Sequence, residues 1–245
     1  MNIWRKDKKV KIIGHRGAKG LAPENTLAGI KKAIEYNVDI IEIDVHISKD
    51  NVPVVIHDET VNRTTNGSGY VFQLTLKELK KLDAGIKFSA EFRGEKIPTL
   101  EEVLLFLKDY PNVSLNIEIK NGPIFYTGIE EKILNLLEKY NFDKRVIISS
   151  FDHNSLKKIK EINSKVCTAI LYACVLYDLG SYIEKIKVDA IHPHFNYITS
   201  DVINTAHSLD IAVNTWIVND IEKFNKLVEL GIDGVGTDYP NLIKF

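Results

Sequence analysis

Short stretches rich in apolar and β-branched residues recur eight times along this chain, with amphipathic segments between most of them. Such nearly continuous apolar runs are typical of parallel strands that are covered on both faces. Eight strands that alternate with helices predict a closed TIM (β/α)8 barrel, and an open doubly wound sheet is the alternative. The eight stretches are Val10–Ile13, Ile40–Val45, Val113–Ile119, Val146–Ser149, Val166–Leu171, Ala190–His192, Ala212–Val218 and Gly234–Thr237.

The length of the chain agrees with this architecture. Its 245 residues are close to the roughly 250 residues of one such barrel, so we expect a single domain over residues 1–245. Helical spacing of apolar residues follows a predicted N-cap at Asn25 or Thr26, and a later helix is expected to end at Gly231. Only Tyr239–Phe245 follow the last strand, so the final helix must be short or missing.

One segment is too long for a connection between a strand and the next helix. It covers residues from about 58 to 98, whereas such connections usually have about two to six residues. We expect a small insertion after strand two, with a helix over Leu76–Leu82. Because function concentrates at the C-terminal mouth of this fold, the insertion is predicted to lie over that mouth.

Composition argues against several classes of partner. The 32 basic and 33 acidic residues nearly cancel, so no overall field attracts nucleic acid or an anionic membrane. No uncharged apolar run reaches the roughly 18 residues of a spanning helix, and Met1–Lys9 lack the apolar stretch of a signal peptide. We therefore expect a cytoplasmic protein without a stable membrane anchor. Cys167 and Cys174 are expected to be buried thiols.

Acidic residues alternate with isoleucines in the second predicted strand. The period of two places the carboxylates of Glu42 and Asp44 on one face, and Asn116, Glu118 and Lys120 repeat the pattern in the third strand. Acids that point into a barrel cannot all stay ionised without a compensating cation. Hard oxygen ligands favour one Mg²⁺ or Ca²⁺ ion, with Glu118 as the third carboxylate.

A second interpretation of these acids stays open. They would then form ion pairs with Lys120 and Arg16, or lie exposed on a tilted edge strand. Three acids on two strands, with two basic groups nearby, favour the metal site over this alternative. Lys120 would then present its positive charge to a substrate oxygen.

Two histidines stand where a TIM barrel carries catalytic groups. His15 closes the first strand, and His57 closes a later extended segment. The guanidinium of Arg16 is suited to a phosphoryl oxygen, and Gly14 and Gly17 would let the backbone approach a ligand closely. Two histidines at a phosphorus centre can divide the work, one accepting a proton and the other donating one to the leaving group.

The order of these motifs resembles the glycerophosphodiester phosphodiesterase family. The resemblance extends from about Lys11 to Pro240, and its motifs are weak singly but highly specific together. They are His15-Arg16-Gly17, Pro23-Glu24-Asn25-Thr26, Glu42-x-Asp44, His57-Asp58, Glu118-x-Lys120, Asn214-x-Trp216 and Gly236-Thr237-Asp238-Tyr239-Pro240.

This resemblance implies a TIM barrel with a small insertion after strand two. It also implies hydrolysis of a small glycerophosphodiester to sn-glycerol 3-phosphate and an alcohol such as choline or ethanolamine, with one divalent metal ion. The residues that carry this chemistry would be His15 and His57 as general acid and base, Glu42, Asp44 and Glu118 as metal ligands, Arg16 and Lys120 on the phosphate, and Trp216 as an apolar wall for the glycerol.

Two other functions remain open. The same barrel serves phosphodiesterases that act on lysophospholipids or phosphoinositides, and a non-catalytic barrel would only bind a phosphoester. Intact histidines and acids favour an enzyme, and the lack of an obvious apolar docking loop favours a small soluble diester. Four aromatic residues either line the mouth and select the alcohol or pack outside the barrel: Tyr172, Tyr177, Phe195 and Tyr197.

Overall fold

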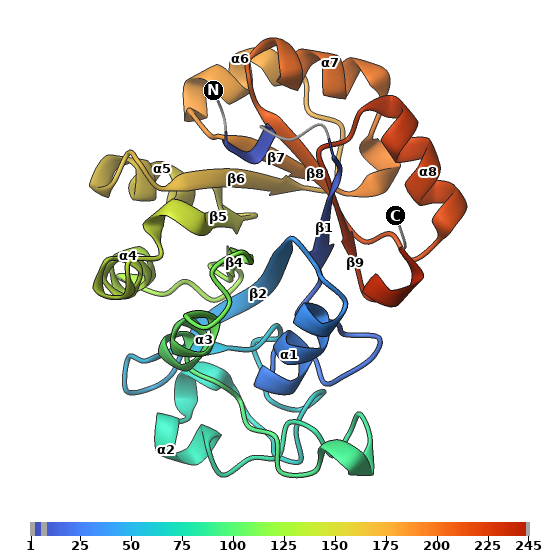
Figure 1. Ribbon diagram of the computed structural model, residues 1–245. Helices are drawn as coiled ribbons and strands as arrows, with labels where there is room; N and C mark the ends of the chain where they lie inside the picture. The colour runs from blue at the N-terminus through green and yellow to red at the C-terminus, as the bar shows by residue number, and fades with distance from the viewer. Residues whose placement is uncertain (1–2, 6–8, 244–245) are drawn as a thin grey trace.

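Eight parallel strands form the centre of the molecule in the computed structural model, which describes residues 3–5 and 9–243 (Figure 1). Parts of the N-terminal stretch Met1–Lys9, and residues 244–245, lie outside the described residues. The barrel strands are β1 (Lys11–Gly14), β2 (Ile40–Ile47), β4 (Ser114–Ile119), β5 (Val146–Ser150), β6 (Cys167–Tyr172), β7 (Ala190–Pro193), β8 (Ala212–Thr215) and β9 (Gly234–Thr237).

Strand pairing closes this sheet on itself. The order runs β1, β9, β8, β7, β6, β5, β4 and β2, and β2 pairs again with β1. All of these pairings are parallel. The predicted TIM barrel is therefore confirmed, and the open sheet is excluded.

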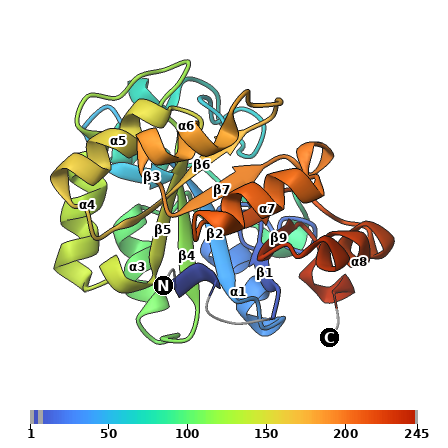
Figure 2. The same cartoon turned by 90° about the horizontal axis from the view of Figure 1, so that it is seen from above.

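Helices surround the barrel (Figure 2). The side chain of Thr26, not Asn25, caps α1 by accepting a hydrogen bond from the Gly29 amide, and Gly231 ends α8 with φ 93°. After β9 only a 3-10 turn, Pro240–Leu242, follows within the described residues, as expected. The helices are α1 (Leu27–Glu35), α3 (Leu100–Leu107), α4 (Ile129–Tyr140), α5 (His153–Ile162), α6 (Leu179–Ile186), α7 (Ser200–Ser208) and α8 (Ile221–Leu230).

The segment after β2 has its own small core. β3 (Pro53–Val55) runs antiparallel to β2, and the segment lies beside α1 and α3 in Figure 1. Its helix α2 (Leu76–Leu79) is shorter than predicted, because the chain continues to Leu82 through tight turns with bonds such as Leu82 N–H to the Leu79 carbonyl. The buried apolar residues are Val54, Ile56, Val61, Val71, Leu79, Ala84 and Ile97.

Two further details of the sequence prediction were wrong. β8 ends at Thr215 rather than Val218, because the chain leaves the ladder there and Trp216 forms only an isolated bridge with His194. Cys174 is exposed rather than buried, because it lies beyond the end of β6, while Cys167 is partly buried; both thiols are free. Among the described residues, no helix combines the length and apolar character needed to cross a bilayer.

Candidate active site

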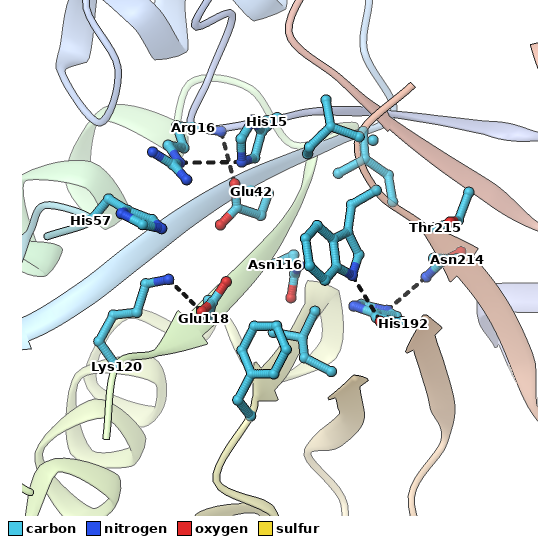
Figure 3. A pocket seen from close by; sticks show the side chains of 16 residues that line it. His15, Arg16, Glu42, His57, Asn116, Glu118, Lys120, His192, Asn214 and Thr215 are labelled. Atoms are coloured by element: carbon cyan, nitrogen blue, oxygen red, sulfur yellow. Dashed lines mark hydrogen bonds and ion pairs between the residues drawn. The ribbon is translucent and has the colours of Figure 1, made fainter. Parts of the chain in front are cut away.

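A cavity opens at the C-terminal end of the barrel, where side chains from most of the strands converge (Figure 3). Only His57 comes from the segment between β2 and β4. No residue of the insertion, 58–98, lines this cavity, whereas Asp58 and Glu59 line the groove that continues from it. The position of the insertion over the mouth stays a prediction. The polar and aromatic residues that line the cavity are His15, Arg16, Glu42, His57, Asn116, Glu118, Lys120, Phe151, His192, Asn214, Thr215 and Trp216.

Three carboxylates meet at this cavity. Glu42, Asp44 and Glu118 each offer an oxygen atom, and these atoms all lie within 4.8 Å of one another. The cause is the parallel register of β2 and β4, in which Asp44 is opposite Glu118 and Glu42 is opposite Asn116. Period two then aims all three acids to the same side. The structure thus brings together the acids that the sequence singled out.

Two basic side chains compensate Asp44. Its carboxylate lies 3.0 Å from Lys120 Nζ and 3.4 Å from Arg16 Nε, and it accepts a hydrogen bond of 2.7 Å from Asn25. Burial alone would raise the pKa of Asp44, but Lys120 and Arg16 outweigh burial and hold this pKa well below its usual range. Asp44 is therefore ionised at neutral pH. The ion pairs of the simpler interpretation are present together with the carboxylate cluster.

Glu42 is less well compensated. Its Oε2 accepts a hydrogen bond of 2.8 Å from the Arg16 amide, while its buried Oε1 has no hydrogen-bond partner. Burial, followed by repulsion from Asp44 and Glu118, raises the pKa of Glu42 well above its ordinary value. Burial also raises the pKa of Glu118, although Lys120 lies 2.5 Å away. An unpartnered buried oxygen within a ring of acids fits a divalent cation.

The two histidines lie on either side of these acids (Figure 3). Nδ1 of His15 lies 2.6 Å from Asp238, and Nε2 of His15 accepts a hydrogen bond of 3.1 Å from Arg16 Nε. Nδ1 of His57 lies 2.7 Å from Asp58. Each imidazole is thus oriented by a carboxylate at Nδ1. Burial lowers the pKa of both histidines.

The loop after β1 packs tightly. A Cβ atom on Gly14 would lie 2.4 Å from the Gly17 carbonyl oxygen, and one on Gly17 would lie 2.5 Å from the backbone of Gly29. The glycines therefore permit close packing of the loop on itself and on α1, rather than the approach to a ligand that the sequence suggested. Arg16 itself has φ 50°, a left-handed conformation that is uncommon for non-glycine residues.

Polar and aromatic side chains of β7, of β8 and of Trp216 form another part of the cavity wall. His192 accepts a hydrogen bond of 2.9 Å from Asn214, and burial lowers the pKa of His192 to about 3, so this imidazole is neutral. Trp216 Nε1 donates to the His192 carbonyl at 2.8 Å. The rings of Trp216 and Phe151 also make an edge-to-face contact, with their centroids 5.7 Å apart. These contacts fix the Trp216 ring against the cavity.

A wider groove continues from the cavity. Its volume is about 420 Å³, compared with about 90 Å³ for the cavity. The two share His57, Glu118, Lys120 and Phe151. Residues that belong only to the groove include three carboxylates and an aromatic ring that is 73% exposed: Asp58, Glu59, Asp152 and Phe125. The four aromatic residues that the sequence offered as possible selectors of the alcohol line neither the cavity nor the groove: Tyr172, Tyr177, Phe195 and Tyr197.

The other histidines have structural partners. His46 bonds the Tyr126 hydroxyl at 2.8 Å and the His57 carbonyl at 2.9 Å, so it supports the backbone of His57. His153 bonds Tyr182 and His207 bonds Asp233. These contacts give the three imidazoles structural roles.

Sequence reasoning left some residues of the site without a role. Asp238 was part of a quoted motif, and its position directly after the last barrel strand was the available signal. Asp58 follows His57 directly and was likewise quoted without a role. For Phe125 and Phe151, which line the groove, no signal in the sequence was available, because their exposure depends on how the loops after β4 and β5 fold.

A TIM barrel that brings three carboxylates, two histidines and two basic side chains to its mouth is typical of hydrolases that act on phosphoric esters. Residues 15–242 match the sequence profile of the Glycerophosphoryl diester phosphodiesterase family, and the chain belongs to this family. It is therefore an enzyme, a phosphoric diester hydrolase.

Similar proteins cover nearly the whole chain. A glycerophosphodiester phosphodiesterase of Caldanaerobacter subterraneus subsp. tengcongensis is 42% identical over 235 residues, which span 96% of each chain. One of Bacillus altitudinis is 36% identical over 94% of this chain and 95% of the relative. The solved structure of an Oleispira antarctica phosphodiesterase, in complex with the product sn-glycerol-3-phosphate, superposes with a TM-score of 0.87 at 30% identity, covering 95% of this chain and 94% of that one.

Proposed function

We propose that the protein hydrolyses small glycerophosphodiesters, such as glycerophosphocholine and glycerophosphoethanolamine, to sn-glycerol 3-phosphate and the free alcohol. The observation that carries this proposal is the meeting of the acid cluster, two carboxylate-oriented histidines, Arg16 and Lys120 at one cavity. The product bound to the similar Oleispira antarctica enzyme agrees with the proposed product.

Arg16 and Lys120 would bind the phosphate. Burial would lower the pKa of both groups, but Asp44 and its acidic neighbours outweigh burial and raise these pKa values, so both side chains stay charged. Glu42, Asp44 and Glu118 would hold one Mg²⁺ or Ca²⁺ ion. When bound, this ion would supply positive charge that stabilises the phosphoryl oxygens in the transition state.

The shapes of the two spaces suggest how a diester is oriented. The smaller cavity, with Trp216 in its wall, would take the glycerol, and the groove would take the alcohol. His15 lines only the cavity, whereas His57 lines both. We therefore assign His15 as the base, because the nucleophile is on the glycerol side, and His57 as the acid that protonates the departing alkoxide.

The bond changes follow from this assignment. The nucleophile, either water or the glycerol 2-hydroxyl, gives its proton to His15 and forms a new P–O bond. The P–O bond to the alcohol breaks, and His57 donates its proton to that oxygen. In the 2-hydroxyl route a cyclic phosphate forms first and is then hydrolysed. ³¹P NMR during turnover would distinguish the routes, since only the second gives a cyclic phosphate signal.

Product analysis tests the proposed substrate class. Incubation with glycerophosphocholine should release choline and sn-glycerol 3-phosphate with multiple turnovers. Turnover of lysophosphatidylcholine alone would instead indicate the lysophospholipid enzyme. Saturable binding without release of alcohol would indicate a binding barrel. The cytoplasmic location expected from the sequence stays a prediction, which cell fractionation can test.

A further inference from the structure

We propose that Arg63, which lies outside the cavity, is a positioning residue for both sides of the phosphodiesterase site. The assignment rests on the proposed function. Arg63 belongs to the insertion, and its guanidinium donates four hydrogen bonds to two carboxylates. Two reach Asp58, at 2.7 and 2.9 Å, and two reach Glu24, at 2.7 and 2.8 Å.

Each of these carboxylates also holds a residue of the site. Glu24 accepts a hydrogen bond of 2.8 Å from Nη1 of Arg16, the proposed phosphate ligand. Asp58 lies 2.7 Å from Nδ1 of His57, the proposed acid. Arg63 therefore ties a residue of the loop after β1 to one of the segment after β3. The two proposed functional groups are connected through a single guanidinium.

The local structure holds Arg63 in place for this role. On either side of it, Val61 and Thr65 are fully buried, and the Thr65 hydroxyl donates to the Val61 carbonyl at 2.7 Å. Between them, Asn62 accepts from the Gly69 amide through its side chain and from Lys87 through its carbonyl. This turn is therefore anchored on both sides, so the Arg63 side chain leaves from a fixed backbone.

The contact differs from an ordinary surface ion pair. The Glu24 side chain is only 9% exposed, and its two oxygens are shared between two guanidinium groups. Planar bidentate contacts of this kind fix the orientation of the carboxylate as well as compensating its charge. Without Arg63, the carboxylates of Glu24 and Asp58 would lose their common partner. Each would be free to turn away from the group that it orients.

The network has two arms: the His57 arm runs from Arg63 through Asp58 to His57, and the Arg16 arm runs from Arg63 through Glu24 to Arg16. Loss of each arm predicts a different kinetic effect. Loss of the His57 arm weakens protonation of the leaving alkoxide, which matters for choline. It matters little for p-nitrophenolate, which leaves without a proton. Loss of the Arg16 arm weakens phosphate binding for every diester. A residue that only stabilised the fold would lower both activities alike.

The experiment compares glycerophosphocholine with the p-nitrophenyl ester of sn-glycerol 3-phosphate. We expect Arg63→Gln to lower kcat/KM about 10- to 100-fold for the choline diester, the usual scale for partners of site residues, and clearly less for the p-nitrophenyl diester. Asp58→Asn should act on the choline diester alone, and Glu24→Gln on both. Arg63→Lys keeps the positive charge but not the bidentate hydrogen bonds of the guanidinium, so it should restore little of the lost activity.

Arg93→Gln is the matched control, because Arg93 is an exposed arginine of the same insertion. It should leave both activities and the melting temperature unchanged. Wild-type rates in Arg63→Gln, or equal losses on both diesters, would overturn the positioning role. Failure of the wild-type protein on both diesters would overturn the proposed function itself, and this assignment with it.

Discussion

Nδ1 of His15 lies 2.6 Å from Oδ1 of Asp238, although the two residues are 223 positions apart in the sequence. Closure of the barrel produces this contact, because β1 pairs with β9 and the His15 amide donates to the Thr237 carbonyl. Since Arg16 Nε donates to Nε2 of His15, the proton of the neutral ring lies on Nδ1. Nε2 of His15 is therefore unprotonated, as a base requires, and its lone pair accepts the hydrogen bond from Arg16 in this structure.

Replacement of each histidine should separate the two proton transfers. His57→Gln should lower kcat for glycerophosphocholine about 10²- to 10⁴-fold, but leave much of the activity on the p-nitrophenyl diester. His15→Gln should reduce both activities, because both reactions need an activated nucleophile. Steady-state kinetics on the two substrates measures this. The reverse pattern would exchange the two roles, and His207→Gln, remote from the cavity, serves as the control.

Metal addition should stabilise the wild-type protein through the carboxylate cluster. At a concentration of about 100 times the dissociation constant, a bound ion adds about 2.7 kcal/mol to the free energy of unfolding. Thermal unfolding with and without Mg²⁺ or Ca²⁺ should show a rise in Tm. Glu42→Gln should abolish most of this rise without lowering the metal-free Tm, because it removes a poorly compensated buried acid. An unchanged rise in this variant would contradict the assigned site.

Removal of the Asp58 carboxylate should change the pH profile. Burial lowers the pKa of His57, and the hydrogen bond that His57 Nδ1 donates to Asp58 opposes this by favouring the protonated ring. In Asp58→Asn the pKa of His57 should fall further, so the alkaline limb of kcat/KM should move to lower pH. The profile of kcat/KM against pH measures this shift. An alkaline limb that moved upward, or not at all, would argue against His57 as the acid.

The groove should influence the choice of alcohol. Phe125 is 73% exposed, and Glu59 and Asp152 line the same groove, so a cationic choline would meet an aromatic face and negative charge. An exposed cation–π contact contributes about 0.5–1 kcal/mol, or roughly a two- to fivefold change in kcat/KM. Phe125→Leu should cost that factor for glycerophosphocholine and leave the neutral glycerol diester unaffected. Equal effects on both diesters would place the alcohol elsewhere.

The barrel and the central acids could be predicted from the sequence because both depend on short-range periodicity. A period of two places Glu42 and Asp44 on one face, and parallel neighbours in the barrel bring Glu118 beside them. His15 and His57 were found because each ends an extended segment. These inferences needed only local spacing and the rules of strand pairing.

Other features depend on contacts that spacing does not encode. Arg63 donates a hydrogen bond to Glu24, which lies 39 positions earlier in the sequence. Only the path of the insertion, set by its own apolar core, brings the two side chains together. Packing also decides which residues of the insertion line the groove, namely Asp58 and Glu59. Likewise, the exposed position of Cys174 depends on where β6 ends.

The most direct test is turnover of glycerophosphocholine by metal-stripped protein, with Mg²⁺ and Ca²⁺ added back separately and sn-glycerol 3-phosphate followed by a coupled assay. The proposed site predicts negligible release without metal and restored release with at least one of the ions. It also predicts no restoration in Glu42→Gln at the metal concentration that saturates the wild type. Full activity of the stripped protein, or no release of sn-glycerol 3-phosphate with either ion, would contradict the account.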